Sequence, residues 1–77
     1  MQVETDDGNW INTRFILNYY FDDNWVFAQM INGDVHKIFH SDMIDHPTCE
    51  KLVKFISVKK LSTNVLSKHD IYTYMDV

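Results

Sequence analysis

The sequence predicts a small α+β domain in which a three-stranded antiparallel meander is followed by one helix. Three observations lead to this prediction. Runs rich in β-branched and aromatic residues alternate with turn residues, an Asn-Gly pair separates two of these runs, and apolar residues recur at helical spacing after the only proline. The expected order is β-β-β-α with a possible C-terminal strand, so that a sheet of three to four strands packs on one helix.

The meander is predicted over 14–39. Its three strands are expected at RFILNYYF (14–21), WVFAQMI (25–31) and DVHKIF (34–39). Asp22, Asp23 and Asn24 supply turn chemistry between the first two. Asn32-Gly33 predicts a type I′ turn between the second and third, because that turn needs positive φ at both central positions.

The helix is predicted over 47–60. Pro47 suits the first helical position, and the apolar residues after it follow the helical period: Cys49, Leu52, Val53, Phe55 and Ile56. Beyond the helix, IYTYM (71–75) is rich in β-forming residues. It predicts a possible terminal strand over 70–77, with Tyr72 and Tyr74 on one face.

The composition predicts a single folded domain over 1–77. Hydrophobic residues make up 45% of the chain, with only two glycines and one proline, which favours a globule over a disordered chain. No apolar run approaches the roughly 18 residues of a membrane span, and the acidic start is unlike a signal peptide. One cysteine cannot form an internal disulfide. We therefore expect a cytoplasmic protein, in the host cytoplasm if the chain is viral, with no membrane partner.

Charge is unevenly distributed along the chain. Residues 1–34, including the acidic segment 1–12, carry six acidic side chains against Arg14 alone, which opposes phosphate binding there. Most of the lysines lie in or near the predicted helix, where an ordinary solvated surface explains them: Lys51, Lys54, Lys59, Lys60 and Lys68. The expectation is that nucleic acid is not the partner.

Three histidines and the only cysteine fall within 36–49, which raises the question of a metal site: His36, His40, His46 and Cys49. If 34–40 is a strand, the Cα atoms of His36 and His40 lie about 13 Å apart, too far to share one zinc ion. A helix over 35–44 would bring the two together, and that alternative stays open. We expect neither a metal nor another cofactor.

Catalysis is also not expected. Asp22 and Asp23 are adjacent carboxylates, but turn formation explains them. Cys49 would need a base such as His46 or His69, and no oxyanion loop is evident. A domain this small has little room for a substrate pocket.

The two faces of the predicted meander are both substantially apolar. The expected pairs are Met30 with Val35, Ala28 with Lys37, and Val26 with Phe39. One helix covers only one face of such a sheet. The second face should therefore meet the N-terminal segment around Trp10, which is short enough to cover only part of it, a second copy of the chain or a different protein. The expected anchors on this face are Tyr20, Trp25, Phe27 and Ile38, with Tyr72 and Tyr74 at an edge.

These observations predict a non-enzymatic protein–protein interaction module. We expect a homodimer that also binds a larger protein and inhibits or adapts it. In size, acidity and lack of a catalytic signature the chain resembles the small proteins with which phages block host enzymes, although no motif carries this resemblance. The alternatives are a nucleic-acid-binding regulator that uses the helix lysines and an acidic DNA mimic.

Overall fold

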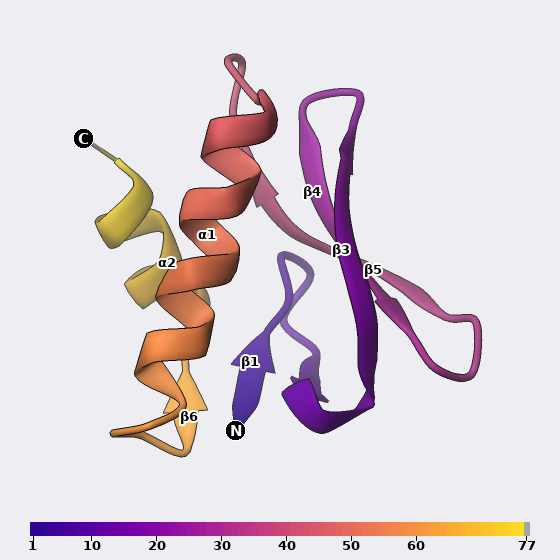
Figure 1. Cartoon of the computed structure of the whole chain (residues 1–77), viewed down its shortest axis with the longest axis vertical. Coiled ribbons are helices and arrows are strands. Elements are labelled where there is room, and N and C mark those ends of the chain that lie inside the picture. Colours follow the sequence, from indigo (N-terminus) through magenta and orange to yellow (C-terminus); the bar gives the residue numbers. More distant parts are fainter. Residues whose placement is uncertain (77) are drawn as a thin grey trace.

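The computed structural model describes residues 1–76 and contains two three-stranded sheets and two helices (Figure 1). The strands are β1 (Gln2–Glu4), β2 (Trp10–Asn12), β3 (Ile16–Asp22), β4 (Trp25–Met30), β5 (Val35–His40) and β6 (Val65–Leu66), and the helices are α1 (His46–Lys59) and α2 (Lys68–Met75). A short 3-10 turn, η1 (Thr13–Phe15), joins β2 to β3. The predicted α+β class, with an antiparallel three-stranded sheet preceding a helix, is confirmed.

The predicted meander is the sheet β3-β4-β5, but the type I′ geometry lies in the first hairpin. Asp22 pairs with Trp25, so the turn has two residues, and both have positive φ: 49° at Asp23 and 66° at Asn24. In the second hairpin only Gly33 has positive φ, at 94°. The Met30 N–H donates to the Asp34 carbonyl at 2.7 Å, which closes a longer loop that needs one left-handed residue.

A β-bulge in β5 changes the predicted register. Val26 pairs with Phe39 as expected, but Phe27 pairs with Lys37, so Ile38 is an extra residue in the ladder. The pairs predicted for Met30 and Ala28 are therefore wrong, since Ala28 lies opposite His36. The extra residue turns Ile38 to the same face as Phe39, and both are buried. Ile38 is thus a core residue and not an anchor on the second face.

The helix predicted over 47–60 is α1, and its first turn is capped by a side chain. The Thr48 hydroxyl and the Thr48 N–H both donate to the Asp45 carboxylate, the N–H at 2.8 Å, and these two bonds lower the pKa of Asp45. Pro47 occupies the first turn, where its missing N–H costs nothing. The helix buries one apolar face made of Cys49, Leu52, Phe55 and Ile56.

The acidic segment 1–12 is part of the core. It forms a hairpin in which β1 pairs with β2, and β1 also pairs in parallel with β6. The side chains of Val3 and Thr5 are fully buried, and Ile11 is nearly so. The segment therefore places its acids on the outside of a hairpin whose alternate residues complete the core.

The strand predicted over 70–77 is wrong for the described residues, since Lys68–Met75 form α2; Val77 lies outside them. Ser67 and Asp70 form a reciprocal capping box that starts the helix. Ile71 on its inner face is fully buried. Capping and packing together override the β propensity of the IYTYM run.

Both helices and the N-terminal hairpin lie on one side of the β3-β4-β5 sheet (Figure 1). Within residues 1–76, neither helix has the length and apolar character that crossing a membrane requires.

Candidate protein-binding surface

The face of the β3-β4-β5 sheet that points away from the helices carries three large aromatic side chains. Along β4, Val26, Ala28 and Met30 are buried, so the alternate residues Trp25 and Phe27 point to the opposite face. We call Tyr20, Trp25 and Phe27 the outer aromatic face. The rings of Tyr20 and Phe27 stack with centroids 5.1 Å apart. Tyr20 remains 37% exposed, while Trp25 and Phe27 are half-buried.

Polar side chains surround these rings. The Lys37 ammonium lies 4.7 Å from the centroid of the Trp25 ring, and the His40 ring lies 4.8 Å from it on the neighbouring strand. Asn18 and Gln29 pair with each other at the other end of the sheet. Aromatic anchors inside a polar rim are the composition found at the centres of protein interfaces.

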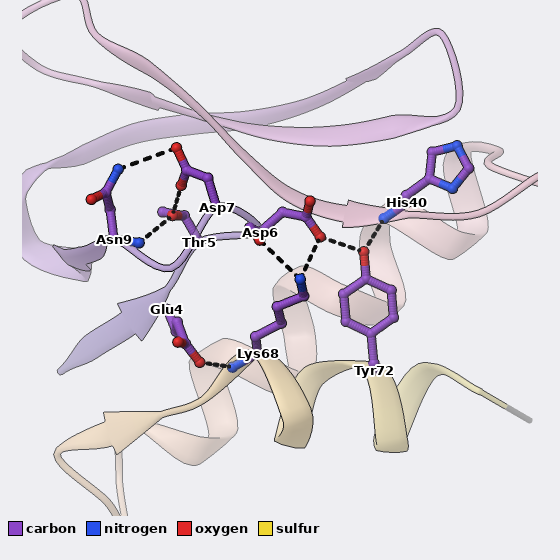
Figure 2. Close-up of polar contacts among 8 residues, drawn as sticks. All are labelled: Glu4, Thr5, Asp6, Asp7, Asn9, His40, Lys68 and Tyr72. Carbon is purple, nitrogen blue, oxygen red and sulfur yellow. Dashed lines mark hydrogen bonds and ion pairs between the residues drawn. The ribbon is translucent and has the colours of Figure 1, made fainter.

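The β5 edge of the sheet is closed by two segments from elsewhere in the chain (Figure 2). The Asp6 N–H donates to the Lys37 carbonyl at 2.8 Å. The His40 N–H donates to the Tyr72 hydroxyl at 2.9 Å. The β1–β2 loop and α2 thus form hydrogen bonds with the β5 backbone groups to which an additional strand would have to bind.

A polar network holds these two segments together. The Tyr72 hydroxyl donates to Asp6 Oδ1 at 3.0 Å, and Lys68 Nζ lies 3.3 Å from the same oxygen. The backbone N–H of Lys68 donates to the Glu4 carboxylate at 2.8 Å (Figure 2). Burial raises the pKa of Tyr72 to about 12, so its hydroxyl stays protonated and can donate to Asp6. Tyr72, predicted as an interface residue, therefore bridges β5 and the β1–β2 loop.

Thr5 fixes the shape of the loop that carries Asp6. Its buried hydroxyl donates to the Asp7 carboxylate and accepts the Asn9 N–H at 3.0 Å. The bond from Thr5 lowers the pKa of Asp7. Asn9 also donates to Asp7, at 3.2 Å (Figure 2). These hydrogen bonds within the loop hold it in a conformation in which the Asp6 N–H points to β5.

The β3 edge is open by comparison. Among residues 1–76, β4 is the only strand that pairs with β3. Asp22 and Trp25 flank a two-residue turn, so they form a hydrogen-bonded pair, and such pairs alternate along the ladder. The backbone groups of Tyr19 and Phe21 consequently point away from β4.

An open groove runs between β3 and α1. Its volume is about 690 Å³, and it is lined by Tyr19, Tyr20 and Phe21 from β3 and by Cys49, Val53 and Lys54, among others, from α1. The Phe21 ring lies 6.4 Å from the His46 ring at one end. Burial raises the pKa of Tyr19 to about 12. The groove therefore places apolar side chains beside the backbone groups of β3 that point away from β4.

Sequence reasoning missed this edge, although the sequence carries a signal for it. Phe15 to Phe21 contain no charged residue and no proline, whereas edge strands usually carry such residues to prevent pairing with other chains. Phe21, which is 39% exposed, belongs to the site and was not predicted.

The structure separates the residues that raised the metal question. His36 and His40 lie on β5, which is a strand and not the alternative helix, while His46 and Cys49 lie on α1. His46 Nε2 contacts Glu50 Oε1 at 3.0 Å. Across residues 1–76, no three histidine, cysteine, aspartate or glutamate side chains are grouped as metal ligands. Burial, with a smaller effect of Glu50, raises the pKa of Cys49, which disfavours the reactive thiolate.

Tyr74, predicted at an edge, lies on α2 against α1. Its ring stacks on Phe55 with centroids 3.9 Å apart, and the Lys51 ammonium lies 5.1 Å from the Tyr74 ring. Lys59 lies 5.7 Å from the Phe55 ring, and Lys68 is paired with Asp6. These lysines are spread over ring faces and an ion pair instead of forming one basic stripe.

Comparison of the chain with protein-family models, with curated proteins and with solved structures gave no match. The surface of the β3-β4-β5 sheet thus combines an aromatic face, one closed edge and one open edge beside a groove.

Proposed function

We propose that this chain is a non-enzymatic protein–protein interaction module that homodimerises, binds a larger protein and inhibits or adapts it. The observation that carries the proposal is the outer aromatic face, where Tyr20, Trp25 and Phe27 lie on the side of the sheet opposite both helices. We propose that the protein acts in the cytoplasm and that, like the small phage proteins it resembles, it binds a protein of the host.

The energetics favour a protein partner for this face. Fully burying a large apolar side chain is worth about 2 kcal/mol, and aromatic pairs contribute somewhat more. The Tyr20–Phe27 stack is already formed, so little side-chain freedom is lost on binding. A preformed aromatic centre of this kind acts as a binding hot spot.

The rim indicates the chemistry of the partner. Lys37 lies over Trp25 and pairs with Phe27, so a carboxylate on the partner could reach its ammonium while an apolar pocket takes the rings. Asp22, at the end of β3, gives a second, opposite charge at the rim. We infer a partner groove that is apolar at its centre and acidic opposite Lys37.

Affinity capture from cells that contain the natural partner tests the proposal. The Tyr20→Ser/Trp25→Ser double variant should lose a protein that the unaltered chain retains. A matched control, Val58→Ser/Leu61→Ser, changes exposed apolar residues at and beyond the end of α1 and should retain it.

Raising the salt concentration separates this function from its rival. Capture through apolar contacts should persist at high salt, whereas lysine–phosphate binding should weaken steeply. Recovery of nucleic acid that is lost at high salt, or retention of the same protein by the double variant, would contradict the proposal.

A further inference from the structure

We propose that two copies of the chain join through β3, which pairs antiparallel with β3 of the second copy to form one six-stranded sheet. The inference rests on the homodimerisation included in the proposed function, and it names the surface and the geometry. Three independent features of β3 support it: its free backbone, its charge pattern and the groove beside it.

The free backbone favours a strand as the occupant. Tyr19 and Phe21 direct their N–H and C=O groups away from β4, and within residues 1–76 these groups make no bond comparable to the Asp6–Lys37 and His40–Tyr72 bonds of the other edge. Exposed edge groups of this kind are a template for pairing with another strand. Both strands in such a pair gain the same hydrogen bonds, which suits a symmetric dimer.

The charge pattern favours a second copy and sets its direction. Arg14 precedes β3 and is the only basic residue in the first 34, while Asp22 and Asp23 stand at the other end. Antiparallel pairing about the middle of β3 brings Arg14 of each copy towards Asp22 and Asp23 of the other. Parallel pairing would set the acidic ends side by side, which is repulsive. The strand is therefore self-complementary in one direction only.

The groove favours a strand at this edge and not at another. A strand added beside β3 lies over the groove, where Val53 and Cys49 of α1 form apolar contacts for its inward side chains. A two-fold axis perpendicular to the sheet keeps both outer aromatic faces on the same side. The dimer would then present a doubled aromatic surface to one larger protein.

Sedimentation equilibrium of the full chain over a range of concentrations is the test. The unaltered chain should dimerise, and Leu17→Lys should weaken the dimer at least about tenfold by placing a charge on the edge strand. Leu17 is 64% exposed, so the variant should remain folded by circular dichroism. Leu61→Lys, at a residue 84% exposed and outside β3, is the matched control and should dimerise like the unaltered chain.

A charge exchange tests the orientation. Arg14→Asp and Asp22→Arg should each weaken self-association about tenfold, because each places like charges opposite one another at both ends of the paired strands. An equimolar mixture of the two variants should restore the dimer. In the mixed dimer the two introduced charges meet at one end, and the unaltered Arg14 and Asp22 meet at the other, so both contacts are attractive. A mixture no tighter than either variant would overturn the antiparallel arrangement.

The outcomes separate this inference from the proposed function. A chain that stays monomeric at all concentrations would overturn the pairing, while capture of a partner through the outer aromatic face would still support that part of the function. A dimer that Leu17→Lys and both charge variants leave unchanged would overturn the β3 interface and keep homodimerisation. If the chain forms the β3 dimer but captures no larger protein, the proposed binding function would be overturned while the β3 interface would stand.

Discussion

The two edges of the β3-β4-β5 sheet are treated in opposite ways. The β5 edge is covered by the β1–β2 loop and α2, through the Asp6 N–H on the Lys37 carbonyl and the His40 N–H on the Tyr72 hydroxyl. The β3 edge has no charged residue between Phe15 and Phe21, and an open groove lies beside it. Two segments distant in sequence cover the first edge, whereas within residues 1–76 no segment pairs with the second, which is interrupted only by the bulge at Leu17. The proposed pairing of β3 with a second copy accounts for this difference between the two edges.

The largest effect is expected at the bulge beside the closed edge. Ile38→Ala should lower the free energy of unfolding by about 3 kcal/mol, because it leaves a cavity at a fully buried position. Val35→Ala, on the same strand but 45% exposed, should cost at most about 0.5 kcal/mol. Urea unfolding of both variants measures the difference. Equal costs would place Ile38 on the outer face and contradict the bulge.

A smaller effect is expected from the residue that closes the β5 edge. Tyr72→Phe removes the acceptor for the His40 N–H and the donor to Asp6, which should cost about 1 kcal/mol. The His40 amide should then exchange faster with solvent. Tyr74→Phe, whose ring stacks on Phe55, is the control. If His40 exchanged at an unchanged rate, Tyr72 would not be what closes this edge.

The loss of stability at alkaline pH is expected to depend on two tyrosines, one near each edge of the sheet. Burial raises the pKa values of Tyr19 and Tyr72 from 10.0 to about 12. Because the pKa of each phenol is higher in the folded than in the unfolded state, each protonated phenol contributes to the free energy of unfolding. This contribution is fully present below pH 10 and is lost as the pH rises from 10 towards 12. Absorbance titration should show late phenolate formation, and Tyr19→Phe and Tyr72→Phe should each reduce its amplitude by one tyrosine. Titration of every tyrosine at its ordinary pKa would show that neither phenol is buried.

The smallest effect on stability is expected on the open edge. Leu17→Lys should change the free energy of unfolding of the dilute, monomeric protein by less than about 0.5 kcal/mol, because Leu17 is 64% exposed. Guanidinium unfolding at low concentration measures this value. A large loss would mean that the β3 edge is part of the folding core, and the contrast between the two edges would disappear.

Local signals in the sequence predicted the meander and α1 well. Turn residues between β-rich runs and the apolar spacing after Pro47 depend on neighbours in the chain, so β3, β4, β5 and α1 fall close to their expected bounds. The capping pattern Ser67-x-x-Asp70 was a local signal for α2 that the β propensity of IYTYM concealed.

The candidate site was predicted only in part. Tyr20, Trp25 and Phe27 follow from simple alternation, and the structure places them on one face. The position of Ile38 does not follow from alternation, because Ile38 is the extra residue of a bulge and the alternation of faces is interrupted there. No residue type in the sequence marks the site of the bulge. The closure of the β5 edge depends on Asp6 and Tyr72, 66 residues apart in sequence, so no local pattern could reveal it.

Amide hydrogen exchange at single-residue resolution, measured on dilute and on concentrated protein, tests the contrast between the edges most directly. In dilute solution the Tyr19 and Phe21 amides should exchange quickly while the His40 amide is protected. On concentration, Tyr19 and Phe21 should become protected and His40 should not change. Protection of Tyr19 and Phe21 that is already complete in the monomer, or no change on concentration, would contradict an open β3 edge that pairs with a second copy.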